Sequence, residues 1–165
     1  MQRITLLCVG KLKEKFDLDA AAEYVKRLSR YCKLDLIELP ESRLPEDPSP
    51  AQIDAALARE AEAVRGRLPA SFCRVARCVE GQTCSSEELA RMLAAWSNRG
   101  EKRLVFLIGG SHGLHESIKV QAWAKLSMSP MTFPHHLARV MLLEQIYRAY
   151  QINAGTKYHK EIPHL

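Results

Sequence analysis

Strand-like segments alternate with helix-like segments along most of the chain. Strand-like stretches cover residues 4–9, 33–39, 72–79 and 103–108, and apolar residues at helical spacing cover about 17–31, 51–65, 85–96 and 134–153. Strands that alternate with helices form a mostly parallel sheet with helices on both faces. We therefore expect an α/β fold of this kind. It would also contain a helix between a glycine-rich turn at 109–113 and residue 125, and a short extended segment at 126–133.

The length of 165 residues favours a single domain, so we expect residues 1–165 to fold as one unit. The sequence contains no run of about 18 apolar residues, so it predicts no membrane span. The apolar stretch after Met1 is too short for a signal peptide. The five cysteines include no C-x-x-C pair, which is typical of reduced cytosolic thiols. The sequence therefore predicts a cytoplasmic protein with neither a membrane nor a metal partner.

The charge balance is a weak guide to function. A formal net charge of +5 is compatible with a polyanionic partner. The early basic cluster between residues 11 and 33 is interleaved with acidic residues. A solvated face of mixed charge is therefore the simpler interpretation of that cluster.

The sequence IGGSHG at 108–113 places two adjacent glycines at the end of the fourth predicted strand. Glycine lets a ligand approach the backbone closely, and ligands of open α/β sheets gather at the carboxyl ends of strands. The turn matches neither the Walker loop nor the dinucleotide fingerprint. Three interpretations of this sequence remain open. It can form a tight turn without a ligand, a ligand site, or the Gly-x-Ser-x-Gly elbow of a hydrolase that uses Ser111.

The hydrolase interpretation needs an acid and a histidine later in the chain. No aspartate follows Asp54, and Glu116 and Glu144 are poorly placed to orient a histidine near the end of the chain. This function is therefore a weaker alternative to ligand binding at the turn.

The last predicted helix is apolar nearly all round, so it has to be covered on more than one side. In a chain this short a second subunit could supply that cover, which predicts a homodimer. Glu144 and Arg148 stand four residues apart on this helix and are expected to form an ion pair.

Several segments, in the order in which they occur along the chain, together resemble those of one protein family. They are VGKLKE at 9–14, LIGGSHGL at 107–114, LSMSPMTFPH at 126–135, RVMLLEQIYRA at 139–149 and YHK at 158–160. The family that they resemble is the SPOUT-class ribosomal RNA large subunit methyltransferase H. The resemblance covers nearly the whole chain. It implies an enzyme that uses S-adenosylmethionine to methylate N3 of a pseudouridine in 23S rRNA of the large ribosomal subunit.

The resemblance also implies a fold feature and a cofactor site. Members of this class tie the C-terminal segment into a deep trefoil knot, although knots are rare in proteins, and dimers place one subunit's tail near the other's pocket. The implied cofactor-binding residues are Arg77, Gly109, Met128, Ser129, Pro130, Met131, Thr132 and Phe133. Arg77 departs from the leucine that the family commonly has there, so a backbone contact would survive the change and a side-chain contact would not.

The tail and the last helix supply the candidate catalytic residues, because tyrosine, histidine and cations gather there next to Gly155. Methylation of an imide nitrogen requires loss of the N3 proton, which calls for a base or for stabilisation of negative charge. His159 would take the proton or orient the imide, and Tyr158 would position the base. Arg148 and Lys160 would stabilise negative charge or hold phosphates. The alternatives are the Ser111 hydrolase and a ribosome-binding module without enzymatic activity.

Overall fold

The computed structural model describes residues 1–68, 73–100 and 103–160, with the backbone alone for residues 73–80. Its elements, in chain order, are β1 (Gln2–Val9), α1 (Lys15–Leu28), β2 (Cys32–Leu39), α2 (Pro50–Arg67), β3 (Cys73–Thr83), α3 (Ser86–Asn98), β4 (Arg103–Ile108), α4 (Glu116–Lys119), β5 (Ala124–Ser127) and α5 (His135–Asn153). The strands form one sheet in the order β2-β1-β4-β3-β5, and each neighbouring pair is parallel. The predicted α/β architecture is therefore confirmed.

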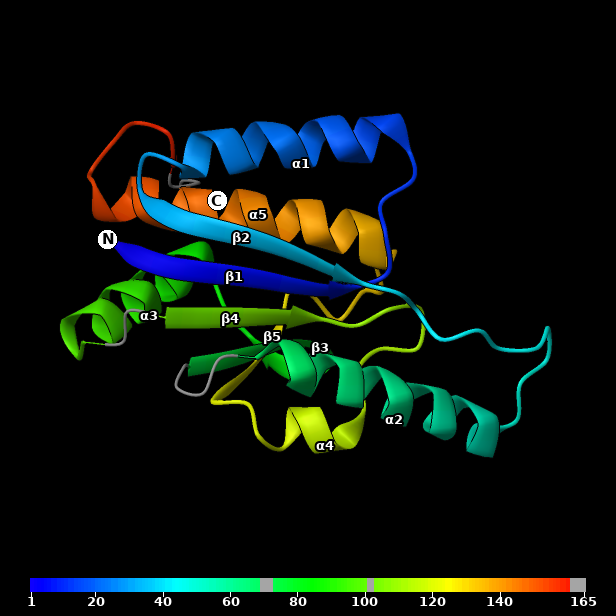
Figure 1. The fold of residues 1–165 in the computed structure, drawn as a ribbon. Helices are drawn as coiled ribbons and strands as arrows, with labels where there is room; N and C mark the ends of the chain where they lie inside the picture. Colours follow the sequence, from blue (N-terminus) through cyan, green and yellow to red (C-terminus); the bar gives the residue numbers. More distant parts are fainter. Residues whose placement is uncertain (69–72, 101–102, 161–165) are drawn as a thin grey trace.

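The sheet is covered on both faces because its central strands are apolar on both sides. Successive side chains of a strand point to opposite faces. In β1, Ile4 and Leu6 pack with α1, α3 and α5, whereas Leu7 and Val9 pack with α2 and α4. Figure 1 shows this division, with α1 and α5 above the sheet and α2 and α4 below it. Burial on both faces is why β1 and β4 have almost continuous apolar sequences.

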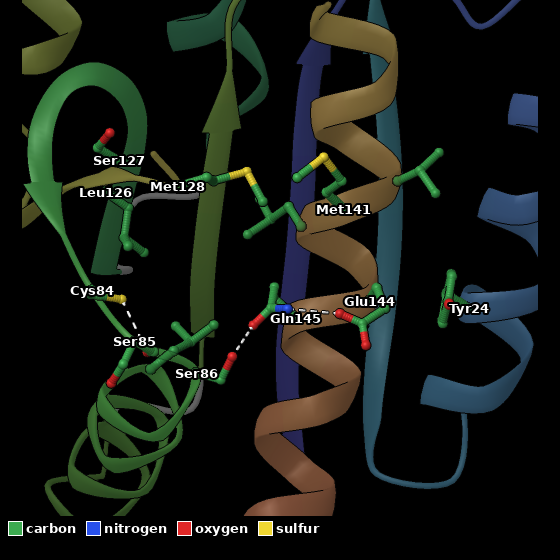
Figure 2. A pocket seen from close by; sticks show the side chains of 13 residues that line it. Tyr24, Cys84, Ser85, Ser86, Leu126, Ser127, Met128, Met141, Glu144 and Gln145 are labelled. Carbon is green, nitrogen blue, oxygen red and sulfur yellow. Dashed lines mark hydrogen bonds between the residues drawn. The ribbon is translucent and has the colours of Figure 1, made fainter. Parts of the chain in front are cut away.

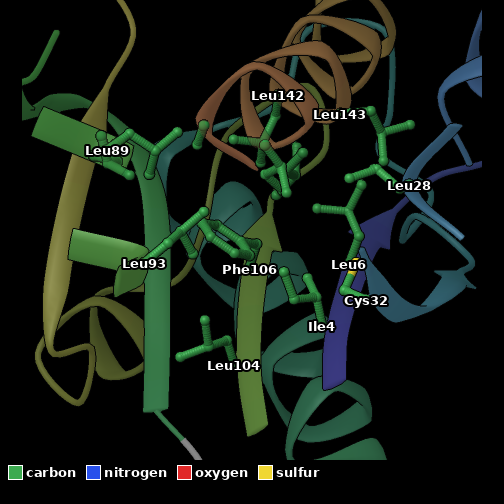
Figure 3. Packing of buried hydrophobic residues seen from close by; sticks show 14 of the residues in the cluster. Ile4, Leu6, Leu28, Cys32, Leu89, Leu93, Leu104, Phe106, Leu142 and Leu143 are labelled. Carbon is green, nitrogen blue, oxygen red and sulfur yellow. The ribbon is translucent and has the colours of Figure 1, made fainter. Parts of the chain in front are cut away.

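The larger core lies between the sheet and the three helices α1, α3 and α5 (Figure 3). Phe106 of β4 is at its centre, beside Leu6 of the neighbouring strand in register. Leu142 and Leu143 close it from α5. The α5 helix is thus covered by the sheet and by both flanking helices of its own chain, and Leu137 near its start is still 43% exposed. In the part of the chain that the structure describes, no helix has the length and hydropathy of a membrane span.

The starts of two helices follow directly from local sequence. The side chains of Ser49 and Ser85 each accept a hydrogen bond from the backbone N–H three residues later, at Gln52 and Glu88. The side chains of Gln52 and Glu88 in turn accept from the backbone N–H of the serine. These reciprocal capping boxes satisfy N–H groups that the first helical turn leaves unpaired. Pro50 occupies the first position of α2, where its fixed φ suits the helix and its missing N–H costs nothing.

The prediction of a helix that extends from the glycine turn to residue 125 was wrong. Helix α4 spans only Glu116–Lys119, and Ala124 and Lys125 belong to β5. His115 caps α4 by accepting from the Ser117 N–H, and Ile118 provides the buried anchor. Beyond α4, Val120 is 66% exposed, so a longer helix would gain little burial. The backbone of β5 instead pairs with β3. Of the extended segment predicted at 126–133, only the first two residues belong to β5.

A buried arginine connects α5 to the ends of β1 and β2. Arg139 is fully buried, and its guanidinium donates to the Glu38 carboxylate at 2.5 Å and to the Gly10 carbonyl at 2.9 Å. Glu38 also accepts from the Leu12 N–H at 3.0 Å. Burial would raise the pKa of Glu38, but the hydrogen bonds from Arg139 and Leu12 outweigh it and hold that pKa below its usual value. These contacts fix the start of α5 at the carboxyl edge of the sheet.

We expect Glu38→Ala to destabilise the fold by about 3 kcal/mol, because it leaves the Arg139 charge buried without its partner. Since the folded-state pKa of Glu38 is lowered, the wild-type contribution is complete above the unfolded-state pKa and is lost as the pH falls through the folded-state value. Urea unfolding at neutral and acidic pH measures both effects. Glu23→Ala, which removes an exposed ion pair with Arg27, is the control and should cost little or no stability, because solvent screens exposed pairs. Equal losses in the two variants would contradict this account.

Candidate active site

A pocket of about 490 Å³ opens between α1, α3, α5 and the end of β5. Figure 2 shows Tyr24 of α1 and Ser86 of α3 on either side of α5, with Met128 beyond the end of β5. Met141 and Glu144 of α5 lie between them, so the floor is apolar toward Met128 and polar toward Glu144. The volume is in the range of sites that bind small molecules and cofactors.

The loop that follows β5 carries most of the cofactor residues predicted from the sequence. Met128 lines the pocket. The Ser127 hydroxyl donates to the Ser129 carbonyl at 3.0 Å, and the Ser129 hydroxyl accepts from the Met131 N–H at 3.0 Å. These bonds hold the loop in a compact turn. Met131 is 70% exposed, and of the segment 128–133 only its first residue is among those that line the pocket.

Two glycines of the turn have close neighbours where a side chain would begin. A Cβ atom on Gly109 would collide with the backbone of Gly113, and one on Gly110 would stand 2.6 Å from the Glu41 carboxylate. Both glycines are buried. Glu41 accepts from the Ser111 N–H at 2.7 Å, so a residue that follows β2 fixes the turn that follows β4. The absence of a side chain is therefore a steric requirement at Gly109, whereas a side chain at Gly110 would have to displace the Glu41 carboxylate.

The carboxylate that fixes the turn is ionised by its surroundings. Burial would raise the pKa of Glu41, but hydrogen bonds from the backbone and side chain of Ser111, with the nearby His135 and His112, hold it below its usual value. Burial lowers the pKa of His135. The Nε2 atom of His135 is buried without a hydrogen-bond partner among the described residues. Glu41 therefore acts as a charged acceptor between β2, β4 and α5.

The tail folds back onto α5 around Glu144. Arg148 donates to Glu144 Oε1 from Nε at 2.9 Å and from Nη2 at 2.6 Å, which confirms the predicted ion pair. The Tyr158 hydroxyl donates to the same oxygen at 3.1 Å, and its ring lies 4.9 Å from the Arg148 guanidinium. Burial, then the Glu144 charge, raises the pKa of Tyr158 to about 12. Tyr158 is therefore a hydrogen-bond donor at neutral pH. Because Glu144 also lines the pocket, the tail lies against one of its walls.

Both ring nitrogens of His159 are engaged in the structure. Arg148 Nη1 lies 3.2 Å from Nδ1, and Glu87 Oε1 lies 2.7 Å from Nε2. Arginine can only donate, so Nδ1 accepts and the proton of the neutral ring is on Nε2, which donates to Glu87. The Glu87 pKa is lowered, first by its own backbone N–H at the start of α3 and then by His159. This pair fixes one tautomer of His159, because a proton on Nδ1 would face the Arg148 cation.

The structure brings together three of the four predicted catalytic residues. Arg148, Tyr158 and His159 form one cluster, whereas Lys160 is exposed at its margin. Gly109 lies at the end of β4, and Arg77 pairs through its backbone with Leu126 of β5. The side chain of Arg77 lies outside the described residues. The part played by each of these residues in binding or catalysis stays a prediction.

Sequence reasoning missed two carboxylates. In the sequence, Glu87 has the pattern of a favourable charge in the first turn of a helix, and Glu41 belongs to no motif. Their partners, His159 and Ser111, are 72 and 70 residues away along the chain. No local pattern reports such contacts. Only a prediction of which loops meet at the edge of the sheet could have found them.

The local structure does not favour the hydrolase alternative. The nucleophile elbow requires a helix that begins directly at the serine, whereas α4 begins only at Glu116, after a further turn. Ser111 is exposed and its contacts are with Glu41. Among the described residues, no histidine forms a hydrogen bond with it.

The chain matches known families along nearly all of its length. A family model described as "Predicted SPOUT methyltransferase" matches residues 2–159. The ribosomal RNA large subunit methyltransferase H of Clostridium novyi is 45% identical over 95% of this chain and 99% of the relative. The protein of the same name from Leuconostoc mesenteroides is 43% identical over the same shares.

Solved structures support the fold independently. A probable methyltransferase from Bordetella pertussis superposes with a TM-score of 0.57 at 13% identity, covering 90% of this chain and 96% of that one. A probable methylase family protein from Haemophilus influenzae gives 0.53 at 15% identity, covering 98% and 71%. At such identities the likeness concerns the fold alone. Together with the family model and the relatives, it leads to one conclusion: the chain belongs to the ribosomal RNA large subunit methyltransferase H family of SPOUT methyltransferases.

Proposed function

We propose that this protein uses S-adenosylmethionine to methylate N3 of a pseudouridine in 23S rRNA of the large ribosomal subunit. The observation that carries the proposal is that one pocket is lined both by Met128, from the predicted cofactor loop, and by Glu144, which anchors the predicted catalytic tail. Cofactor and reacting groups would thus meet at a single site. Membership of the methyltransferase family supports the reaction class.

The residues present fit S-adenosylmethionine. The pocket offers apolar surface from Leu126 and Met128 beside polar groups from Ser86 and Glu144, as an amphipathic cofactor requires. Gly109 lets the turn pack against the backbone of Gly113, at the carboxyl end of β4 where ligands of open α/β sheets gather. We assign the cofactor to Gly109 and residues 128–133, with Arg77 contributing its backbone. When bound, the cofactor supplies an electrophilic methyl group on a sulfonium.

The residues of the tail would handle the proton that the substrate loses. Because its pKa is raised, the Tyr158 hydroxyl keeps its proton and positions the target nucleobase by donating a hydrogen bond. Arg148 stabilises the negative charge that develops on the imide as N3–H is lost. As Arg148 moves toward that charge, it leaves Nδ1 of His159, and this freed nitrogen takes the proton while Glu87 holds the other side of the ring. Lys160 contributes a phosphate contact at the margin.

Three further features belong to the proposal. Helix α5 begins beside Gly10, whereas β5 lies at the far edge of the sheet, so residues 128–134 have to cross beyond the ends of β3 and β4. This crossing supports a deep trefoil knot in the C-terminal segment. The exposed Leu137 on α5 supports a homodimer through this helix, for which sedimentation should give twice the chain mass. We also place the protein in the cytoplasm, where ribosomes are assembled.

Calorimetric titration with S-adenosylmethionine tests the cofactor assignment. We expect one site per chain, with an affinity that falls about tenfold or more in Met128→Asp, because a carboxylate in the apolar part of the pocket costs at least about 1.4 kcal/mol of binding. Ser29→Ala, at the exposed C-terminal end of α1, is the control and should bind normally. No heat of binding, together with intact ribosome binding, would instead identify a ribosome-binding module without enzymatic activity.

A further inference from the structure

A second hollow, of about 620 Å³, lies between α3 and the edge strand β5. Its walls include Trp123, which precedes β5, Arg91 of α3 and Lys125 of β5. The backbone at Gly81 is pressed so closely against Lys125 that a Cβ there would stand 2.7 Å from the Lys125 carbonyl oxygen. The base of this groove is therefore a tight contact between strands that a side chain could not enter.

Trp123 is the unusual feature of this groove. Its side chain is 56% exposed, whereas the chain's other tryptophan, Trp96, is 7% exposed in the core. Tryptophan is enriched at interfaces because its ring offers a large apolar face together with a polar N–H. Every nucleobase has a π-face, so an exposed aromatic ring beside a backbone-binding cation suits single-stranded nucleic acid. Bases outside a helix are recognised in RNA by this kind of stacking.

The charge of the groove suits a phosphate backbone. Arg91 and Lys125 are both exposed, and the acidic residue in the lining is Glu88. The carboxylate of Glu88 is engaged by the Ser85 N–H at 2.6 Å in the capping box of α3. Two cations thus face one carboxylate that already has a partner. Polar groups of Gln82 and Thr83 complete the wall and could donate to or accept from a base edge.

The groove adjoins the candidate active site. Cys84 and Leu126 line both hollows, so a thin wall of two residues separates them. A nucleotide chain that runs from the active-site pocket over this wall enters the groove. The groove is therefore placed to hold a neighbour of the target nucleotide.

From these observations we infer that the groove between α3 and β5 binds an unpaired nucleotide of the RNA substrate next to the target, with its base stacked on Trp123 and its phosphates contacting Arg91 and Lys125. This inference rests on the proposed function, because it takes RNA as the substrate. It assigns the groove a role in substrate binding and none in cofactor binding. Variants of the groove should therefore weaken RNA binding while the affinity for S-adenosylmethionine stays constant.

Tryptophan fluorescence tests the stacking directly. In a Trp96→Phe variant, Trp123 is the sole tryptophan, and excitation at its red edge reports on the groove alone. Titration with a single-stranded oligoribonucleotide should quench its emission and protect it from iodide. Unchanged emission at saturating RNA would overturn the inference. Protection that depends on protein concentration and is indifferent to RNA would also overturn it, in favour of an interface between copies of this chain.

Methyl-transfer kinetics test the consequence with purified large ribosomal subunits as acceptor. We expect Trp123→Ala to raise the KM for the acceptor about 10- to 100-fold, the range measured for one stacked base, and Trp123→Phe to restore most of the loss. Arg91→Glu and Lys125→Glu should each reduce the salt dependence of binding by about one phosphate contact. Arg67→Glu, at the end of α2 on the opposite face of the sheet, is the matched control and should change neither value.

The two proposals fail in different ways. If the wild-type protein transfers methyl groups and Trp123→Ala has the same KM, the groove assignment is wrong and the enzyme assignment stands. If the wild-type protein transfers none while RNA still quenches Trp123, the groove binds RNA and the proposed reaction is wrong.

Discussion

His159→Ala is expected to lower the single-turnover rate of methyl transfer about 100- to 1,000-fold, in the range of a lost general base. The affinity for S-adenosylmethionine should stay within about twofold of wild type, because the ring contacts Glu87 and Arg148 and does not line the pocket. Quenched-flow measurement with large subunits in excess gives the rate, and calorimetry gives the affinity.

Two conservative variants separate proton transfer from orientation. In His159→Gln the amide can reproduce the donor to Glu87, and in His159→Asn the amide oxygen can replace Nδ1 as the acceptor for Arg148. If His159 takes the proton, both variants remain as slow as the alanine variant. Full recovery in either one would show that His159 only orients its neighbours.

Gly109→Ala has the second large expected effect. The new Cβ would overlap the backbone of Gly113, so the turn has to shift, and overpacking of this kind costs about 1–3 kcal/mol. If the shift removes the backbone from the cofactor site, binding should weaken about 10- to 100-fold. Calorimetry measures the affinity, and urea unfolding measures the stability of the same variant.

Gly66→Ala is the matched control for this substitution. Gly66 lies within α2, and a Cβ there would meet nothing within 4 Å, so alanine should be neutral or stabilising by up to about 1 kcal/mol. Normal cofactor affinity in Gly109→Ala, with a folded protein, would remove the glycine turn from the cofactor site.

The architecture was predictable because local sequence patterns indicate its main strands and helices. The continuous apolar sequences of β1 and β4 report burial on both faces, and Ser49 and Ser85 report their helix starts. The length of α4 was not predictable, since the residues after Lys119 have acceptable helix propensity. Pairing of Ala124 and Lys125 with β3, a tertiary effect, decides their structure.

The candidate site was predictable only in part, for the same reason. The ion pair between Glu144 and Arg148 follows from spacing along one helix. The pairing of His159 with Glu87 depends on where the tail returns to α3, and the pairing of Ser111 with Glu41 depends on two loops meeting beyond the sheet. The sequence indicates the candidate residues, and only the fold shows the carboxylates that contact His159 and Ser111.

The most direct test of the central claim is methyl transfer from labelled S-adenosylmethionine to naked 23S rRNA, isolated large subunits and assembled ribosomes in parallel, followed by nuclease digestion and mass spectrometry of the labelled nucleoside. We predict that label enters at one position, N3 of a pseudouridine in 23S rRNA, and that His159→Ala loses it. Label on another base or another atom, or no label with any of the three acceptors, would contradict the assignment.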